Sequence, residues 1–342
     1  MITLDYFHQK LYFHQPFKLS GNQRNFTDSV IVKLQNQNLE GYGEACLPPY
    51  LVETKESVEA FLKKVDPLKL NLFHLEETMD YLDSLSGGNC AVKAALDMAM
   101  HDLLGKIEST PVCRYYDSEF PTNIQTVFTI GLSSEEEMLE KLETAKDFKT
   151  IKLKLGSEKD LQIVEFFLSQ TKQSFCVDVN QGWKSQEEAL EKSLWMQEKG
   201  ALFIEQPMPK TRIKENKIIR DNLQIPLLAD ESFQTLADLD SISENFSGIN
   251  IKLSKCGGIF RAAKIIEQAR KKNLKIMLGC MSESSCAIAA GAHLASRADF
   301  VDLDSPMLIK NDPFDGILYK NGNLSLISKK GLGIKRRENE DY

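Results

Sequence analysis

Carboxylate side chains end several apolar segments in the second half of this 342-residue chain. Asp178, Glu205 and Asp230 each close a short apolar run, in the segments VDVN, FIEQP and LADES. Three carboxylates at successive strand ends suit a hard divalent cation, with water and substrate oxygens completing an octahedron. Histidine and cysteine do not occur at comparable positions, which argues against zinc. The sequence therefore predicts a Mg²⁺ site formed by these three residues.

Lysines accompany these carboxylates. Lys152 and Lys154 lie two residues apart in TIKLKLG, so an extended strand directs both to one face; an exposed edge strand is the alternative interpretation. We expect Lys154 to face Lys252 across the site, where neighbouring positive charge would depress the pKa of each lysine. Such lysines can move a proton near neutral pH, one on each face of a substrate carbon. Lys152 is expected to face a developing oxyanion, and Lys255 to be a charge at the rim.

The spacing of these residues predicts repeated strand–helix units. From Lys154 the steps to Asp178, Glu205, Asp230 and Lys252 are 24, 27, 25 and 22 residues, which is the length of a strand, a helix and two short loops. The pattern predicts an α/β fold whose parallel strands close into a TIM-like barrel. A doubly wound open sheet is the alternative, but no glycine-rich turn follows its first strand. The expected strands are 125–130, 150–155, 175–179, 202–205, 226–229, 248–253, 275–279 and 299–303, and the expected helices between them include 134–147, 158–171, 185–199 and 258–272.

The flanking regions follow other patterns. Alternating segments over 2–13, 28–35 and 41–45, followed by helical segments over 54–65, 73–84 and 89–105, predict an α+β domain. Asn89 is the expected N-cap of the last helix. Residues 310–327 predict a hairpin that turns at Asn321-Gly322, and the charged tail from residue 329 is expected to be frayed.

Composition narrows the class of protein. The hydrophobic fraction is 42% and the charged fraction 27%, as in ordinary globular proteins. A net charge of −7 provides no basic surface for nucleic acid or an anionic membrane. We find neither a membrane-span-length apolar run nor a signal-peptide core in the sequence. Seven cysteines without paired spacing predict free thiols and a cytoplasmic location.

Taken together, these segments resemble the enolase superfamily, and in particular its muconate-lactonizing subgroup. The resemblance also covers VIVKL, GYGEA and AALDMAMHDLLGK in the first domain. It implies a (β/α)7β barrel over residues 118–309 and an N-terminal α+β capping domain over 1–117, completed by about 310–342. The strand-end series that carries it is KLK, VDVN, FIEQP, LADES, NIKLSKCGG, GCMSES and DLD.

The final DLD resembles the dipeptide epimerases of that subgroup. The resemblance implies Mg²⁺-dependent inversion of the α-carbon of a dipeptide's C-terminal residue through an enediolate, with L-Ala-D/L-Glu or a similar dipeptide as substrate. It makes Lys154 and Lys252 the acid/base pair, and we also expect a homo-oligomer. The residues expected to bind the substrate are Lys152 (carboxylate), Asp302 and Asp304 (α-ammonium), Thr129, Arg24 in a loop at 17–27 (acidic side chain), Cys280 and Ser282.

Several alternatives stay open at this point. The enzymes o-succinylbenzoate synthase, N-acylamino-acid racemase and muconate cycloisomerase share the fold, but their substrates lack the ammonium that Asp302 and Asp304 would bind. These two aspartates could also be purely structural. A Schiff-base aldolase using Lys154 as nucleophile leaves the three carboxylates and Lys252 without a role. A non-catalytic sugar- or peptide-binding protein does not explain why both lysines and all the metal ligands are present.

Overall fold

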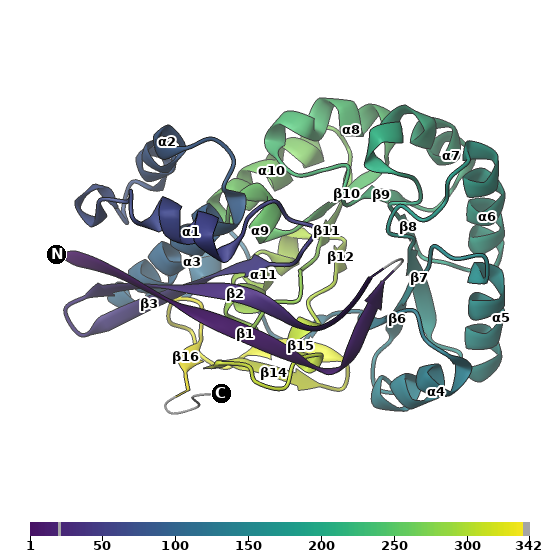
Figure 1. Ribbon diagram of the computed structural model, residues 1–342, viewed down its shortest axis with the longest axis horizontal. Helices are drawn as coiled ribbons and strands as arrows, with labels where there is room; N and C mark the ends of the chain where they lie inside the picture. The colour runs from purple at the N-terminus through teal and green to yellow at the C-terminus, as the bar shows by residue number, and fades with distance from the viewer. Residues whose placement is uncertain (20–21, 338–342) are drawn as a thin grey trace.

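The computed structural model describes residues 1–19 and 22–337, which form two lobes (Figure 1). The first lobe contains an antiparallel sheet of β1 (Ile2–Leu19), β2 (Asn22–Asn36) and β3 (Leu39–Leu47), in that order. Helices α1 (Lys55–Leu62), α2 (Leu75–Leu85) and α3 (Cys90–Ile107) follow, with short 3₁₀ turns at Pro67–Lys69 and Val112–Tyr116. The three strands and three helices expected in this region are confirmed.

Helix α3 packs directly on β3 and is buried on nearly all sides. Its small residues allow this approach, and so does Gly43, where an added Cβ would lie 1.9 Å from the Ala95 carbonyl oxygen. The predicted cap at Asn89 is wrong: this residue has φ 53°, and its side chain makes no capping bond. Its amide donates instead to the Ser86 hydroxyl and the Gly87 carbonyl. The amides of the first helical turn are bound instead by Glu53, whose carboxylate accepts from Ala91 at 2.7 Å and from Val92 at 3.2 Å.

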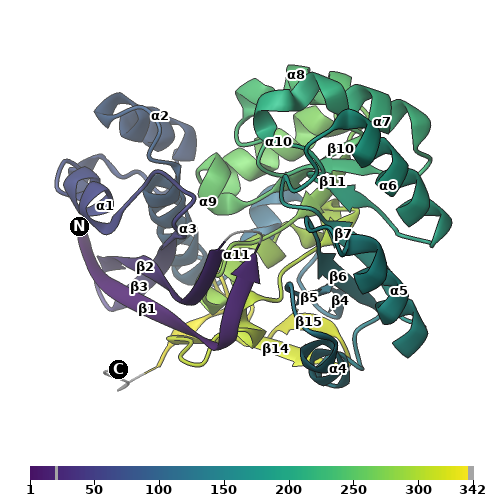
Figure 2. The ribbon, with the colours of Figure 1, turned by 45° about the vertical axis from the view of Figure 1, so that its right-hand side comes forward.

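The second lobe is a curled sheet of eight parallel strands in the order β12-β11-β10-β9-β8-β7-β6-β5. The Val127 amide donates to the Val301 carbonyl at 3.0 Å, which joins the two ends of the sheet. The predicted α/β barrel is therefore confirmed, and Figure 2 shows helices along its outside. Its strands are β5 (Phe128–Ile130), β6 (Thr150–Lys154), β7 (Ser174–Asp178), β8 (Ile204–Glu205), β9 (Leu227–Ala229), β10 (Gly248–Ile251), β11 (Lys275–Leu278) and β12 (Phe300–Val301).

The barrel helices fill the connections between these strands. Amphipathic segments bury their apolar side against the sheet, and the expected helices at 134–147, 158–171, 185–199 and 258–272 are present with slightly shorter bounds. The helices are α4 (Glu135–Thr144), α5 (Asp160–Gln170), α6 (Gln186–Glu198), α7 (Asn216–Asn222), α8 (Leu239–Asn245), α9 (Leu253–Cys256), α10 (Ile259–Lys271) and α11 (Ser285–Ala292), with 3₁₀ turns at Lys210–Glu215, Leu236–Asp238, Ala295–Arg297 and Ser305–Met307.

The C-terminal segment forms the expected hairpin, from β14 (Ile317–Lys320) and β15 (Asn323–Leu326). Both residues of its turn, Asn321 and Gly322, have positive φ, as a two-residue hairpin turn requires. Strand β15 also pairs with β4 (Ile124–Gln125). Residues 124–125 therefore belong to this small sheet, and the first barrel strand begins later than the sequence indicated.

The chain after residue 329 is more ordered than expected. Strand β16 (Lys335–Arg336) pairs with β13 (Phe314–Asp315), and Leu332 and Ile334 are buried. The Leu332 amide donates to Asp102 on α3. The expectation of a frayed tail is thus wrong up to residue 337, because a buried carboxylate of the first lobe binds its backbone; residues 338–342 lie outside the described residues.

Buried acids of the first lobe also bind the barrel helices. Asp97 on α3 accepts the Ile259 amide at the start of α10, and Glu44 on β3 accepts the Ser284 amide and hydroxyl at the start of α11. Unpaired amides at helix N-termini favour such carboxylates. The first lobe is thereby fixed over the barrel, close to Ser282.

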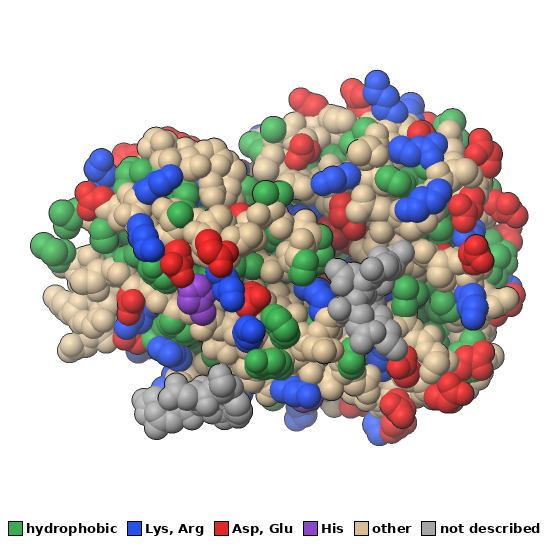
Figure 3. All heavy atoms as spheres, in the orientation of Figure 1, with side chains coloured by type: hydrophobic (Ala, Val, Ile, Leu, Met, Phe, Trp, Pro, Cys, Tyr) green, Lys and Arg blue, Asp and Glu red, His purple; other side chains and the backbone are tan. Residues whose placement is uncertain are grey.

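The charged side chains on the surface are mixed in sign, as expected from a composition with no basic excess. Figure 3 shows acidic and basic side chains interspersed over this face of both lobes. All seven cysteines are free, as predicted. None of the helices in the described part of the chain is long and apolar enough to cross a membrane.

Candidate active site

Three buried carboxylates meet where consecutive barrel strands end. Asp178 and Glu205 are the last residues of β7 and β8, and Asp230 follows β9 directly. One oxygen from each of the three lies within 4.8 Å of the others. Burial, and next the charge of Asp178, raise the pKa of Glu205 to about 7. Since three carboxylates confined in one buried place repel one another, this donor set suits a hard cation.

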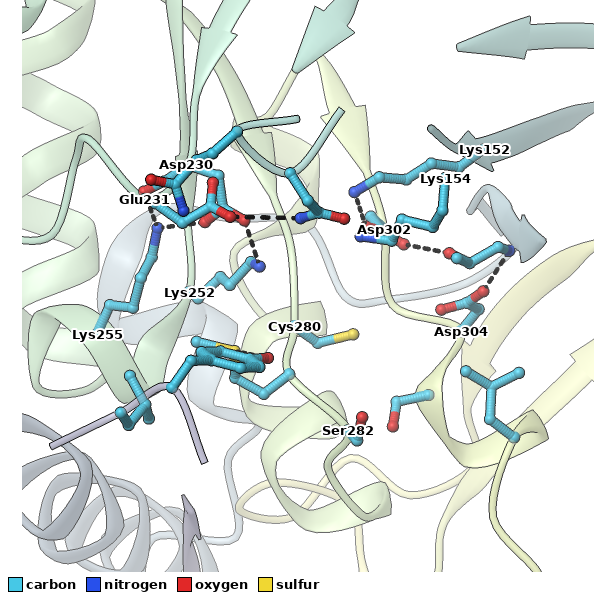
Figure 4. Close-up of a pocket in the computed structure, with 18 of the residues that line it drawn as sticks. Lys152, Lys154, Asp230, Glu231, Lys252, Lys255, Cys280, Ser282, Asp302 and Asp304 are labelled. Atoms are coloured by element: carbon cyan, nitrogen blue, oxygen red, sulfur yellow. Dashed lines mark hydrogen bonds and ion pairs between the residues drawn. The ribbon is translucent and has the colours of Figure 1, made fainter. Parts of the chain in front are cut away.

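Two lysines from β6 compensate part of this charge. Lys152 is 1% exposed, and its Nζ lies 2.7 Å from Glu205, 2.7 Å from Asp302 and 3.2 Å from Asp178. Lys154 Nζ lies 2.6 Å from Asp178. Both side chains leave the same face of β6, because alternate residues of a strand share a face. Figure 4 shows this pair on one side of the site and Lys252 with Lys255 on the other.

Lys252 stands opposite Lys154 in the barrel. It follows β10, which is four strands from β6 in the eight-stranded order, so the two lysines face each other across the closed sheet. Lys252 Nζ donates to Asp230 Oδ2 at 2.7 Å. Burial acts to lower the pKa of Lys252, but the charge of Asp230 outweighs it and holds that pKa well above the usual value. The predicted depression of this pKa is therefore not found, because the nearest charges are carboxylates.

Lys255 is not the rim charge that the sequence indicated. It is 5% exposed, and its Nζ donates at 2.6 Å to Asp230 Oδ1 and also to three backbone carbonyls. Burial by itself raises the pKa of Asp230, but Lys252 and Lys255 together hold it well below its usual range. Asp230 is thus kept ionised by two ammonium groups.

Asp302 and Asp304 follow β12 and lie beside β5. Asp302 is paired with Lys152 and accepts the Thr129 hydroxyl at 3.4 Å. Asp304 accepts the Thr129 amide at 2.6 Å. Burial, and next the charge of Asp302, raise the pKa of Asp304 to about 7. Lys152 compensates part of the charge of Asp302, so Asp304 is the less compensated of the two carboxylates.

A cavity of about 370 Å³ opens beside these groups. Arg24 contributes to its wall from β2; it is 9% exposed and donates to the Thr27 hydroxyl. The expected loop at 17–27 is therefore mostly strand where it is described, and residues 20–21 lie outside the described residues. Asp178 and Glu205 are fully buried and are not among the residues that line the cavity. The expected site residues that line it are Arg24, Thr129, Lys152, Lys154, Asp230, Lys252, Cys280, Ser282, Asp302 and Asp304.

Two further residues that line the cavity, Glu231 and Tyr50, were not predicted from the sequence. Glu231 follows Asp230, and burial followed by the charge of Asp230 raises its pKa to about 7. Its Oε1 accepts the Asn180 side-chain amide at 3.4 Å. Adjacency to a strand-end carboxylate was the signal available for Glu231. Tyr50, whose hydroxyl donates to the Met281 sulfur, had no such signal, because only the packing of the first lobe on the barrel brings its loop to the site.

Comparisons with known proteins agree with this architecture. The L-Ala-D/L-Glu epimerase of Bacteroides thetaiotaomicron is 39% identical over 337 residues, covering 98% of this chain and 88% of that protein. The solved N-succinyl Arg/Lys racemase of Bacillus cereus has a TM-score of 0.91 at 28% identity, covering 98% of this chain and 95% of that one. A dipeptide epimerase of Enterococcus faecalis, solved with Mg and L-Leu-L-Tyr, has a TM-score of 0.90 at 26% identity, covering 97% and 99%.

The family models cover both lobes. The model of the mandelate racemase / muconate lactonizing enzyme N-terminal domain matches residues 1–115. The enolase C-terminal domain-like model matches residues 135–340. The chain therefore belongs to the mandelate racemase / muconate lactonizing enzyme family of the enolase superfamily.

Proposed function

We propose that this protein is a Mg²⁺-dependent dipeptide epimerase that inverts the α-carbon of the C-terminal residue. The observation that carries the proposal is the pair of lysines on opposite strands, each hydrogen-bonded to a carboxylate of the Asp178–Glu205–Asp230 cluster. Inversion needs one group on each face of the carbon to remove and return a proton. The relative from B. thetaiotaomicron, named an L-Ala-D/L-Glu epimerase, supports the same activity.

Asp178, Glu205 and Asp230 would hold the metal, because buried carboxylate oxygens are the ligands that Mg²⁺ prefers. When bound, Mg²⁺ supplies positive charge that offsets the negative charge developing on the substrate carboxylate. Lys152 adds a buried ammonium beside the same place. In this proposal one of Lys154 and Lys252, as the neutral amine, would take the α-proton, and the other, as the ammonium, would donate a proton to the opposite face. The named E. faecalis epimerase with bound Mg and dipeptide supports this choice of cofactor.

The amino end of the substrate would lie at Asp304 and Asp302. A free α-ammonium is a suitable partner for buried carboxylates whose charge is only partly compensated. Arg24, in the cavity wall on β2, would bind an acidic C-terminal side chain. These assignments favour L-Ala-L-Glu and similar dipeptides.

An N-acylamino-acid racemase is the second candidate, since the similar B. cereus structure is named an N-succinyl Arg/Lys racemase. An N-succinyl group carries a carboxylate where a dipeptide carries an ammonium. It would therefore meet Asp304 and Asp302 with charge of the same sign. This electrostatic mismatch favours the dipeptide.

A dipeptide library in D₂O tests the proposal. We expect deuterium at the α-carbon of the C-terminal residue, with both epimers formed from L-Ala-L-Glu, and N-acetyl and N-succinyl amino acids as the comparison set. Exchange confined to the N-acyl compounds would replace the epimerase assignment with a racemase. Borohydride trapping of substrate on Lys154 would instead indicate a Schiff-base enzyme.

A further inference from the structure

The ammonium group of Lys255 is bound entirely by hydrogen-bond acceptors inside the protein. Its Nζ donates to Asp230 Oδ1 at 2.6 Å, the Asp230 carbonyl at 2.7 Å, the Phe233 carbonyl at 2.9 Å and the Asn250 carbonyl at 3.1 Å. An ammonium carries three hydrogens, so four acceptors use its whole donor capacity. A group held in this way is poorly suited to move a proton to or from a substrate.

The turn that carries Lys255 explains its position. Helix α9 begins at Leu253, one residue after Lys252. Residues three apart on a helical turn lie side by side, so Lys252 and Lys255 reach the same carboxylate. Lys252 binds Asp230 Oδ2 at 2.7 Å, and Lys255 binds Oδ1. Both oxygens of Asp230 are therefore held from one turn of the chain (Figure 4).

Asn250 extends the same arrangement to a second carboxylate. Its carbonyl accepts from Lys255, and its side-chain amide donates to Glu205 Oε1 at 2.7 Å. Asn250 is buried and lies on β10, two residues before Lys252. The segment from Asn250 to Lys255 thus orients two of the three clustered carboxylates.

We propose that Lys255 is a positioning residue that holds Asp230 in the orientation needed to bind the divalent cation. This inference rests on the proposed function, and in particular on its metal site. It gives different roles to the two lysines that bind Asp230: Lys252 faces the substrate, and Lys255 orients the Asp230 carboxylate toward the metal. Loss of such an outer partner typically weakens metal affinity by about 10–100-fold.

The charge of Lys255 acts in the opposite direction, because an ammonium repels a cation. Its four acceptors surround Nζ with a carboxylate oxygen and the negative ends of three carbonyl dipoles, which reduces its field at the cluster. Removing it would leave Asp230 Oδ1 without its lysine partner, with only Oδ2 still held by Lys252, and would leave three carbonyls without their donor. We therefore expect positioning to outweigh repulsion.

The experiment titrates Mn²⁺, as a spectroscopic probe, into chelator-treated full-length enzyme and measures free Mn²⁺ by EPR. Lys255→Met is compared with wild type and with Lys93→Met as a matched control. Lys93 is also a buried lysine, 1% exposed, and donates to Asp83 at 2.7 Å and to the Ser86 carbonyl. It lies on α3 in the first lobe and, like both of its partners, does not line the cavity. We expect the Mn²⁺ Kd to rise about 10–100-fold in Lys255→Met and to stay within about threefold in Lys93→Met.

A second readout separates positioning from catalysis. Raising Mg²⁺ should restore most of kcat in Lys255→Met, while Lys252→Met should bind Mn²⁺ well and stay inactive at any Mg²⁺ concentration. Unchanged or tighter Mn²⁺ binding by folded Lys255→Met would overturn the inference. If Lys255→Met and the milder Lys255→Gln both fail to fold, the residue serves the fold and the inference is wrong.

The proposed function can fail separately. Wild type that binds Mn²⁺ tightly but epimerises no dipeptide would refute the substrate assignment while the Lys255 comparison still stands. Wild type that binds no Mn²⁺ would overturn both the metal site and the role of Lys255.

Discussion

Replacing Asp304 with Asn tests how the protein would recognise a free amino terminus. Asp302 is already paired with Lys152 at 2.7 Å, whereas Asp304 accepts a neutral backbone amide, that of Thr129, at 2.6 Å. More of the negative charge at Asp304 is therefore left for a substrate ammonium. Asn has nearly the same shape, and its side-chain oxygen can still accept from Thr129. The substitution removes the charge and keeps the local geometry.

The size of the effect follows from the type of interaction. A hydrogen bond to a charged group contributes about 1.5–3 kcal/mol, and about 1.4 kcal/mol corresponds to tenfold. We therefore expect kcat/KM for L-Ala-L-Glu to fall roughly 10- to 100-fold in Asp304→Asn, while N-acetyl-L-Ala-L-Glu is unaffected or improved. Because the pKa of Asp304 is raised to about 7, the assay belongs near pH 8. In wild type, use of the free dipeptide should decline below pH 7 as Asp304 becomes protonated.

Asp312→Asn is the matched control. Asp312 is also buried and accepts the Ser285 amide at 3.0 Å and the Ser285 hydroxyl at 2.6 Å, in the C-terminal segment. Asp312→Asn should change kcat/KM for the free and the N-acetylated dipeptide by the same factor. The measurement is the ratio of kcat/KM for the free and the N-acetylated dipeptide in wild type and both variants. An identical ratio in wild type and Asp304→Asn would refute the reasoning, and wild-type preference for the N-acyl compound would favour an N-acylamino-acid racemase.

Three further predictions concern the metal, the bases and the pH dependence of stability. EDTA should abolish epimerisation and Mg²⁺ restore it; full turnover by metal-stripped enzyme would exclude the metal role of Asp178, Glu205 and Asp230. Lys154→Ala and Lys252→Ala should each lose epimerisation, with either variant retaining α-proton exchange for one isomer only, read by mass in D₂O; wild-type rates in both would contradict a two-base mechanism. Burial raises the pKa of Glu44 to about 7 from a usual 4.5, so its stabilising contribution is complete below pH 4.5 and is lost as pH rises through 7. In wild type the free energy of unfolding should therefore fall by on the order of 3 kcal/mol as pH rises, and Glu44→Gln, whose side chain is always neutral, should lack this fall. The measurement is Tm between pH 5 and 8, and the same dependence of Tm on pH in variant and wild type would contradict the prediction.

Much of the fold could be predicted because the relevant signals are local and periodic. Each strand–helix unit repeats at a nearly constant length, and parallel strands bring their carboxyl ends to one edge. That rule predicts the common location of Asp178, Glu205 and Asp230 without any knowledge of contacts. The alternation of a strand likewise predicts that Lys152 and Lys154 share a face. Asn321-Gly322 predicted its turn because few other residues accept positive φ there.

The errors arose where distant parts of the chain meet. Lys255 has the same charge and nearly the same position in sequence as Lys252. It is buried because its ammonium binds carbonyls of two separate segments, Asp230 and Phe233 after β9 and Asn250 on β10, which only the fold brings together. The segment around Arg24 was expected to be a loop because its residues are mostly polar. In the structure it is part of β2 and pairs with β1 in a long hairpin. Asp102, more than two hundred residues away in sequence, orders the chain at Leu332.

The pKa values depended on tertiary structure most of all. Sequence reasoning placed like charges near Lys252 and expected a depressed pKa, yet its nearest neighbour is Asp230 at 2.7 Å and that pKa is raised. Asp302 and Asp304 look equivalent in DLD, but Lys152 reaches only Asp302 within ion-pair distance. Residue types and their spacing determined which ionisable groups gather at the barrel mouth. Which of them pair was decided by the tertiary structure, because Coulomb energies vary with distances and burial that spacing along the chain does not encode.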